Sequence, residues 1–98
     1  MNKKNVENPE EFYARLRSSL LESATWPAPY LYKFIVASDP VKIKEVAEVF
    51  KDKDAVFTHQ LSKNGKYTSI SIRVTLDNPD AVIDLYKEVG AIDGVISL

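Results

Sequence analysis

Hydrophobic and polar residues alternate without interruption along residues 67–76. One set is Thr68, Ile70, Ile72, Val74 and Leu76, and the other is Tyr67, Ser69, Ser71, Arg73 and Thr75. A period of two is typical of a β-strand, because successive side chains of a strand point to opposite faces of its sheet. The pattern predicts a strand whose first set lies in the core and whose second set lies outside it.

Three segments with the periodicity of amphipathic helices each follow an Asx-Pro pair. The pairs are Asn8-Pro9, Asp39-Pro40 and Asn78-Pro79. The Asx side chain can accept hydrogen bonds from the free N–H groups of a first helical turn, and proline is tolerated at the first position because its missing N–H has no partner there. Apolar residues then recur at intervals of three and four, which predicts helices over residues 9–22, 40–50 and 79–89.

Three further segments have the composition of strands. Residues 30–37 are aromatic or β-branched and apolar on both faces, as expected for a central strand, whereas residues 55–62 mix apolar and polar side chains, as expected at an edge. Residues 91–98 predict a short closing strand. Asn64-Gly65 favours a type I′ hairpin, and Gly90 favours a left-handed residue at the end of the last helix.

The two halves of the chain match when one is shifted by 39 positions, which places Pro40 on Pro79. Each half is then a strand-helix-strand unit. Two interleaved units form a ferredoxin-like βαββαβ sandwich of the α+β class, in which a four-stranded antiparallel sheet carries two helices on one face. The helix over residues 9–22 is an addition to that fold. We expect a flexible N-terminus over residues 1–8 and a single domain over residues 9–98.

The composition excludes several classes of function. Cysteine is absent, so disulfides, thiolate metal sites and a cysteine nucleophile are excluded. The 13 Lys and Arg residues nearly balance the 14 Asp and Glu residues, and the interspersed signs give no electrostatic attraction for nucleic acid or an anionic membrane. No apolar stretch approaches the roughly 20 residues of a membrane helix, and no apolar signal core follows the N-terminal lysines. We expect a cytoplasmic protein that binds neither membranes nor nucleic acids.

The sequence contains no constellation typical of catalysis or cofactor binding. His59 is the single histidine, and no serine or carboxylate is placed by spacing to form a triad or a metal pair with it. Asp39, Asp77 and Asp93 are scattered, and helix capping or turns account for them. Gly65 lacks the further glycines of a phosphate-binding loop. We therefore expect a protein that is not an enzyme and that holds no cofactor or metal.

The exposed side of the predicted sheet, called the open face below, is the candidate interaction surface. Its members are Leu31, Lys33, Ile35, Tyr67, Ser69, Ser71 and Arg73. Helices on one side of the sheet would leave the apolar members in contact with water, so part of this face is expected to be covered. Three arrangements remain open. The N-terminal helix folds back over the face, a second copy or another protein covers it, or the helix packs elsewhere beside the other helices.

RNA binding through the open face is disfavoured by its composition. RNA-recognition domains share the ferredoxin-like architecture, but they stack bases on aromatic side chains spaced along the exposed face of the sheet. Here Tyr67 is followed on that face by Ser69, Ser71 and Arg73.

Several motifs resemble those of one family of small bacterial proteins. They are Trp26-Pro27-Ala28-Pro29-Tyr30-Leu31-Tyr32-Lys33, Ser62-Lys63-Asn64-Gly65-Lys66-Tyr67-Thr68-Ser69-Ile70-Ser71-Ile72, Leu85-Tyr86 and Val95-Ile96-Ser97-Leu98. Together they resemble the YbeD-like family, a domain family of unknown function, over residues 26–98. The resemblance implies a ferredoxin-like fold similar to the ACT regulatory domains, which bind amino acids and often pair through their sheets or helices. It implies no activity.

Two features depart from that family. The helix over residues 9–22 exceeds the short lead of the familiar members. The loop Ser38-Asp39-Pro40 lacks the glycine typical of ACT ligand loops, and it places a carboxylate at the helix start, where the carboxylate of an amino acid would otherwise be favoured.

Two hypotheses of function follow from the sequence. The leading one is a non-enzymatic binding or regulatory module that contacts a protein partner, or a second copy of itself, through the open face. The alternative is an ACT-type domain that senses a small molecule, an amino acid, as a dimer with the ligand near residues 38–42.

Overall fold

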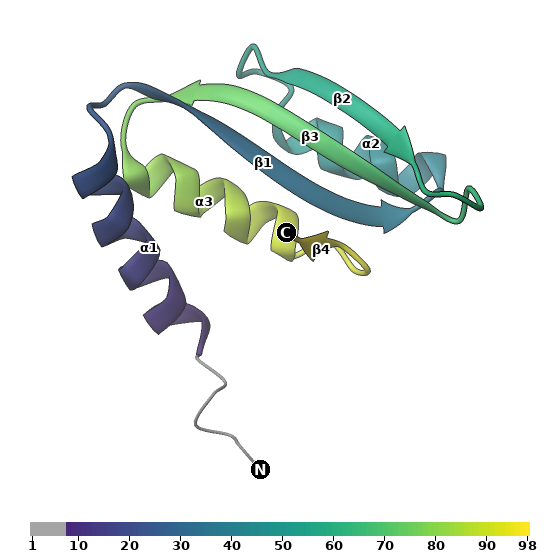
Figure 1. Ribbon diagram of the computed structural model, residues 1–98, viewed down its shortest axis with the longest axis horizontal. Coiled ribbons are helices and arrows are strands. Elements are labelled where there is room, and N and C mark those ends of the chain that lie inside the picture. The colour runs from purple at the N-terminus through teal and green to yellow at the C-terminus, as the bar shows by residue number, and fades with distance from the viewer. Residues whose placement is uncertain (1–7) are drawn as a thin grey trace.

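Residues 8–98 of the computed structural model form one antiparallel sheet with helices. The elements in chain order are α1 (Pro9–Ser23), β1 (Ala28–Ala37), α2 (Pro40–Val49), β2 (Val56–Leu61), β3 (Tyr67–Leu76), α3 (Pro79–Gly90) and β4 (Ile96–Ser97). The strand order is β2-β3-β1-β4 (Figure 1), which is the predicted ferredoxin-like βαββαβ arrangement preceded by α1. Apart from Asn8, the flexible N-terminus predicted over residues 1–8 lies outside the described residues.

Each helix begins at its predicted Asx-Pro pair. The side chain of Asn8 accepts a hydrogen bond from the backbone N–H of Glu11 (2.8 Å), and those of Asp39 and Asn78 accept from Val41 and Ala81 (both 2.9 Å). Proline occupies the first turn of all three helices. The helix starts are therefore fixed locally, by a capping acceptor and by a residue that needs no donor.

The longest pairing in the sheet joins β1 to β3 over ten residues, from Ala28 opposite Leu76 to Ala37 opposite Tyr67. The predicted facing of both strands is confirmed. Their inward side chains include Tyr32, Phe34, Val36, Ile70, Ile72 and Val74, each at most 2% exposed. Val46 of α2, Phe50 at the end of α2, and Val82, Leu85 and Val89 of α3 complete this core.

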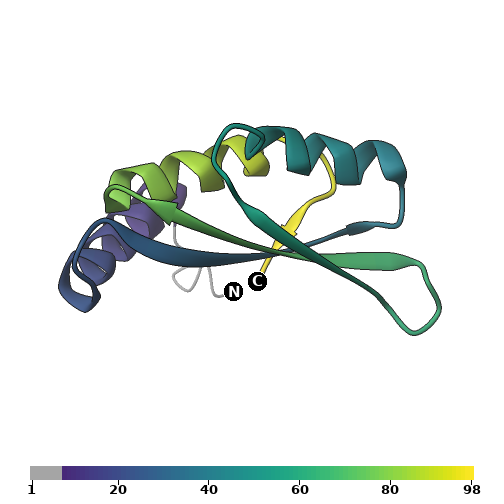
Figure 2. The ribbon, with the colours of Figure 1, turned by 90° about the horizontal axis from the view of Figure 1, so that it is seen from above.

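The helices lie on one side of the sheet. Figure 2 shows α2 and α3 along one face and no helix over the other, while α1 lies beside α3 at the end where β1 begins. The Arg17 Nε atom is 2.7 Å from an Asp80 carboxylate oxygen, and no residue of α1 is buried. Of the three arrangements that the sequence left open, α1 adopts the one beside the other helices. It therefore leaves the open face uncovered.

A cluster of tyrosines links β1 to α3. The Tyr32 hydroxyl donates to the Val82 carbonyl (2.8 Å), and the hydroxyls of Tyr30 and Tyr86 are 2.8 Å apart. Burial raises the pKa of Tyr32 well above the ordinary tyrosine range. Burial, together with the hydrogen bond to Tyr30, raises the pKa of Tyr86 in the same way. The fold therefore favours the protonated phenols at these positions.

β1 begins two residues earlier than predicted, at Ala28, so that Pro29 lies inside the strand. The backbone carbonyl of Lys33 points away from β3 and accepts a hydrogen bond from the Leu98 N–H (2.9 Å). The direction of the backbone groups alternates along a strand, so the backbone of Pro29, four residues earlier, also points away from β3. On that side β4 pairs only with Phe34 and Ile35 and does not reach Pro29. The missing N–H of Pro29 therefore costs no hydrogen bond within the sheet.

The turn between β2 and β3 differs from the predicted two-residue type I′ hairpin. Residues 62–66 separate the two strands, and a hydrogen bond from the Ser62 N–H to the Tyr67 carbonyl (2.8 Å) closes a loop of the four residues 63–66. Gly65 has a positive φ of 76°, whereas Asn64 does not have a positive φ. The Gly65 N–H donates to the Ser62 carbonyl (2.9 Å), so residues 62–65 form a β-turn whose two central residues do not have the positive φ of a type I′ turn.

The end of the chain also differs from its prediction. The helix α3 continues through Gly90, which does not have a positive φ, and it is the later Gly94 that has a φ of 82°. β4 contains only Ile96 and Ser97 of the strand predicted over residues 91–98. Since α3 runs longer and a turn at Gly94 follows it, few residues are left to pair with β1.

The core assignment makes a stability prediction. Replacing Ile72, which is fully buried, by Ala is expected to lower the free energy of unfolding by about 2–5 kcal/mol, because it removes packed methyl groups and leaves a cavity. The neighbouring Ser71→Ala on the open face is the control and is expected to cost less than about 1 kcal/mol. Urea denaturation measures both values. A larger loss for Ser71→Ala would show that β3 is oriented the other way.

The tyrosine cluster predicts alkaline destabilisation. The folded-state pKa values of Tyr32 and Tyr86 are raised, so both phenols are protonated in the folded and unfolded states below about pH 10, the ordinary tyrosine value, and stability is fully present there. As the pH rises above about 10, only the unfolded state loses these protons, and stability falls. Tyr86→Phe is expected to flatten this fall, measured by urea denaturation as a function of pH. The exposed Tyr67→Phe is the control, and an equal flattening in it would contradict the assignment.

Candidate functional site

The candidate site is the open face, which the strand register arranges as a grid. Going from β2 across to β4, the first row is Val56, Arg73 and Leu31, the second is Thr58, Ser71 and Lys33, and the third is Gln60, Ser69, Ile35 and Ile96. Tyr67 stands opposite Ala37 one row further on. The structure places all seven residues predicted for this face on it, and it adds Val56, Thr58, Gln60 and Ile96.

The added residues lie on β2 and β4, whose facing the sequence did not predict. The short alternation of β2 is blurred by its polar composition, and β4 has two residues. The signal that identifies them is their register opposite Arg73, Ser71, Ser69 and Ile35, which follows only from the strand order.

Apolar side chains surround a polar centre on the open face. Leu31 is 48% exposed, Tyr67 49%, Ile96 56% and Val56 64%. Between them β3 carries Arg73 beside Leu31 and the small side chains Ser69 and Ser71. A shallow hollow of about 420 Å³ is lined by Leu31, Val56, Thr58, Ser71 and Arg73. A second of about 300 Å³ is lined by Ile35, Gln60, Leu61, Ser62, Tyr67 and Ser69.

The charge on the open face is positive. Lys33 stands opposite Ser71, so Arg73 is its diagonal neighbour on the adjacent strand, at a Cα separation of roughly 7–8 Å. Neither cation forms an ion pair within residues 8–98. None of the side chains that the register directs to this face is a carboxylate. The face is therefore locally basic on a chain whose formal net charge is −1.

His59 does not belong to the open face. It stands opposite the inward-facing Ile70, so its side chain is directed to the helix side of the sheet, where it is exposed at the edge. Within residues 8–98, no group of three or more His, Asp or Glu side chains is placed to hold a metal ion. In the same part of the chain, no helix is long and apolar enough to cross a membrane.

The loop that leads into α2 uses its polar groups internally. The Asp39 carboxylate accepts from the Val41 N–H (2.9 Å), and the hydroxyls of Ser38 and Thr68 are 2.9 Å apart. An amino acid bound at residues 38–42 would have to compete with the Asp39 carboxylate for the helix N-terminus.

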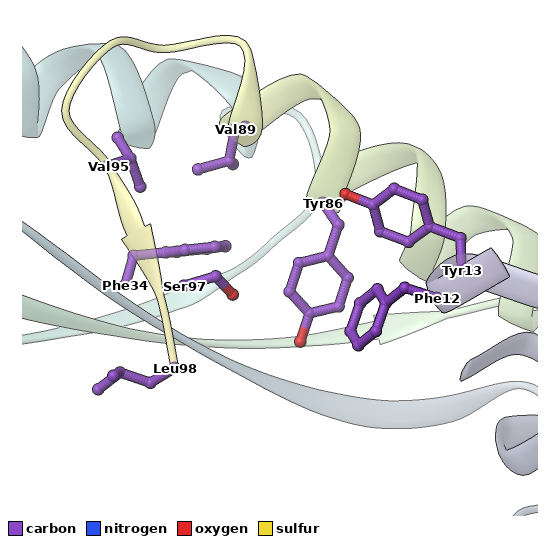
Figure 3. A pocket seen from close by; sticks show the side chains of 9 residues that line it. Phe12, Tyr13, Phe34, Tyr86, Val89, Val95, Ser97 and Leu98 are labelled. Carbon is purple, nitrogen blue, oxygen red and sulfur yellow. The ribbon is translucent and has the colours of Figure 1, made fainter. Parts of the chain in front are cut away.

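An apolar crevice lies away from the open face, between α1, α3 and β4. It has a volume of about 240 Å³, and its walls include Phe12 and Tyr13 from α1, Phe34 from β1 and Tyr86 from α3 (Figure 3). The sequence did not predict it, because it depends on the packing of α1 beside α3 and on a β4 that contains only two residues.

The sequence matches a known family. The family model described as "Protein of unknown function (DUF493)" matches residues 22–98, which contain the whole sheet with α2 and α3. The UPF0250 protein YE3006 of Yersinia enterocolitica is 30% identical over 81 residues, which are 80% of this chain and 93% of that protein. The UPF0250 protein YbeD of Escherichia coli is 31% identical with the same coverage.

A solved structure shares the fold. The solution structure of protein HP0495 from H. pylori matches with a TM-score of 0.62 and 20% sequence identity. The aligned region covers 78% of this chain and 86% of HP0495. At this identity the likeness concerns the fold alone. The open face lies within the residues that the family model matches, whereas most of α1 precedes them.

Proposed function

This chain belongs to the DUF493 family of proteins of unknown function, and we propose that it is a non-enzymatic binding module that holds another protein against the open face of its sheet. The observation that carries the proposal is the set of half-exposed apolar side chains around the polar centre of this face, Leu31, Val56, Tyr67 and Ile96. Exposure of large apolar side chains to water is unfavourable, and several of them on one face are typical of an interaction site.

The chemistry of the open face suits contact rather than reaction. It consists of aliphatic and aromatic side chains, hydroxyls, one amide and two cations. These groups form hydrogen bonds and ion pairs with a partner, and none of them is held beside a base that would activate it as a nucleophile. The proposal therefore places the protein among regulators or adaptors, acting in the cytoplasm.

Shape supports the same proposal. The two hollows lie on either side of the small central side chains, and the sheet already accepts helices on its other face. A partner that fills both hollows would bury the apolar residues and give the sheet a second covering layer.

The proposal predicts a loss of binding on charge insertion in the open face. Isotope-labelled protein mixed with a concentrated native cell extract is expected to show perturbed amide signals in β1 and β3, and Leu31→Asp is expected to abolish them. Leu21→Asp on α1 is the matched control, because Leu21 is 50% exposed and Leu31 48%. Perturbations confined to α1 or to loops remote from β1 and β3, or an equal effect of both variants, would contradict the proposal.

The alternative of an amino-acid sensor predicts binding at residues 38–42 and has less support, because Asp39 already occupies the start of α2. We expect the amide signals of these residues not to move when free amino acids are added to millimolar concentration. Asp39→Ala is the matched variant, because it removes the carboxylate that accepts from the Val41 N–H at the N-terminus of α2. Saturable shifts in the wild-type loop would restore the sensor hypothesis.

A further inference from the structure

We infer that the segment recognised by the open face is an amphipathic helix of another protein that carries a carboxylate between two apolar residues about two turns apart. This inference rests on the proposed function and names the chemistry of its partner. Three features of the grid carry it: the distance between its apolar ends, the uncompensated positive charge between them, and the arrangement of the two hollows.

The apolar ends set the spacing of the partner's side chains. Leu31 and Ile35 are four residues apart on β1, so their Cα atoms are separated by roughly 13 Å. A helix places residues seven or eight positions apart at about 10.5–12 Å and on a similar face. One apolar side chain of such a helix would enter the hollow beside Leu31 and Val56, and the next would enter the hollow beside Ile35 and Tyr67.

The charges specify what lies between those two side chains. Lys33 is midway between Leu31 and Ile35, whereas its diagonal neighbour Arg73 stands opposite Leu31 at the edge of the first hollow. The small Ser71 opposite Lys33 leaves room above the sheet at this point. A carboxylate three or four positions from each apolar residue would lie over Lys33 and Arg73, where its charge relieves the repulsion between two like charges.

A second copy of this chain fits the open face poorly. Two open faces packed together would pair one positively charged surface with another, because none of the side chains that the four strands of the described residues direct to this face is a carboxylate. The helix α1 of a second copy is also a poor match, because its middle carries Arg15 and Arg17 while its acidic residues lie near its ends.

Nucleic acid fits less well than an acidic helix. Affinity for a phosphate backbone grows with the number of phosphates neutralised, and the open face offers two cations. Single-stranded nucleic acid also needs successive stacking platforms, whereas Tyr67 is the one aromatic residue directed to this face and stands at its end.

A display selection tests the inference. A library of helical peptides, with three outward positions at i, i+4 and i+7 fully randomised, is selected against the wild-type protein and against the Lys33→Glu/Arg73→Glu variant. We expect apolar residues at the outer positions and Asp or Glu in the middle for the wild type, and Lys or Arg in the middle for the variant. Lys44→Glu/Lys63→Glu, which changes exposed cations elsewhere by the same charge, is expected to select the wild-type pattern.

Binding of one selected peptide then gives the magnitude. Replacing its middle Glu by Gln is expected to weaken binding to the wild type about three- to tenfold, as for one or two exposed charge pairs, and the difference is expected to shrink at high salt. Amide signals identify the site, and spectra of the free variants verify that they are folded.

The outcomes separate the inference from the proposed function. Selected peptides that lose binding to Leu31→Asp but show no acidic preference would overturn the inference and leave the proposed function standing. Peptides that bind Leu31→Asp as well as wild type would overturn both. A wild-type dimer in solution that Lys33→Glu/Arg73→Glu alters would assign the face to a second copy. Tighter binding of a single-stranded oligouridine, lost in the same variant, would assign it to nucleic acid.

Discussion

The register between β1 and β3 is the constraint on which the rest of the molecule depends. Ten consecutive residues of each strand pair, so the even-numbered residues of both strands face the helices and the odd-numbered residues face away. A slip of β1 by one residue would direct Lys33 into the core and expose Tyr32, and a slip of β3 would do the same to Arg73 and Ile72. The core and the candidate site are therefore two sides of one pairing. The Tyr32 hydrogen bond to Val82 and the contact of Tyr86 with Tyr30 then tie α3 to the same strand.

Much of the fold was predictable because its signals are local or periodic. The Asx-Pro pairs specify three helix starts with their own side chains, and the alternation along residues 67–76 specifies which of its side chains are buried. The incorrect predictions concern segments whose conformation depends on how many residues connect two elements rather than on which residues these are. Asn64-Gly65 is typical of a two-residue hairpin, but four residues lie inside the hydrogen bond from Ser62 to Tyr67 that closes the loop. Gly90 permits a left-handed end to α3 without requiring one, and the helix continues through it.

The candidate site was only partly predictable for a related reason. Alternation identifies which residues of one strand share a face, but it does not say which residues of two strands are neighbours. The diagonal between Lys33 and Arg73, and the rows that add Val56 and Ile96, exist only once the strand order is known. The position of α1 was open as well. An apolar stripe shows that a helix packs against something but not against what, and the contact between Arg17 of α1 and Asp80 of α3 joins residues 63 positions apart.

The proline inside β1 has a consequence for assembly. Within residues 8–98, only residues 33–35 of β1 contact a neighbouring strand or Leu98 on the side that turns away from β3, and the backbone of Pro29 lies along the uncovered part. A strand of another protein could extend the sheet by pairing with this edge of β1. It would find no N–H donor at Pro29, so one backbone hydrogen bond of the new pairing would be missing. Addition of a further strand, which is the first step in the growth of β-fibres, is therefore disfavoured at this edge. Association through the open face, where side chains rather than backbone groups make the contacts, is not affected.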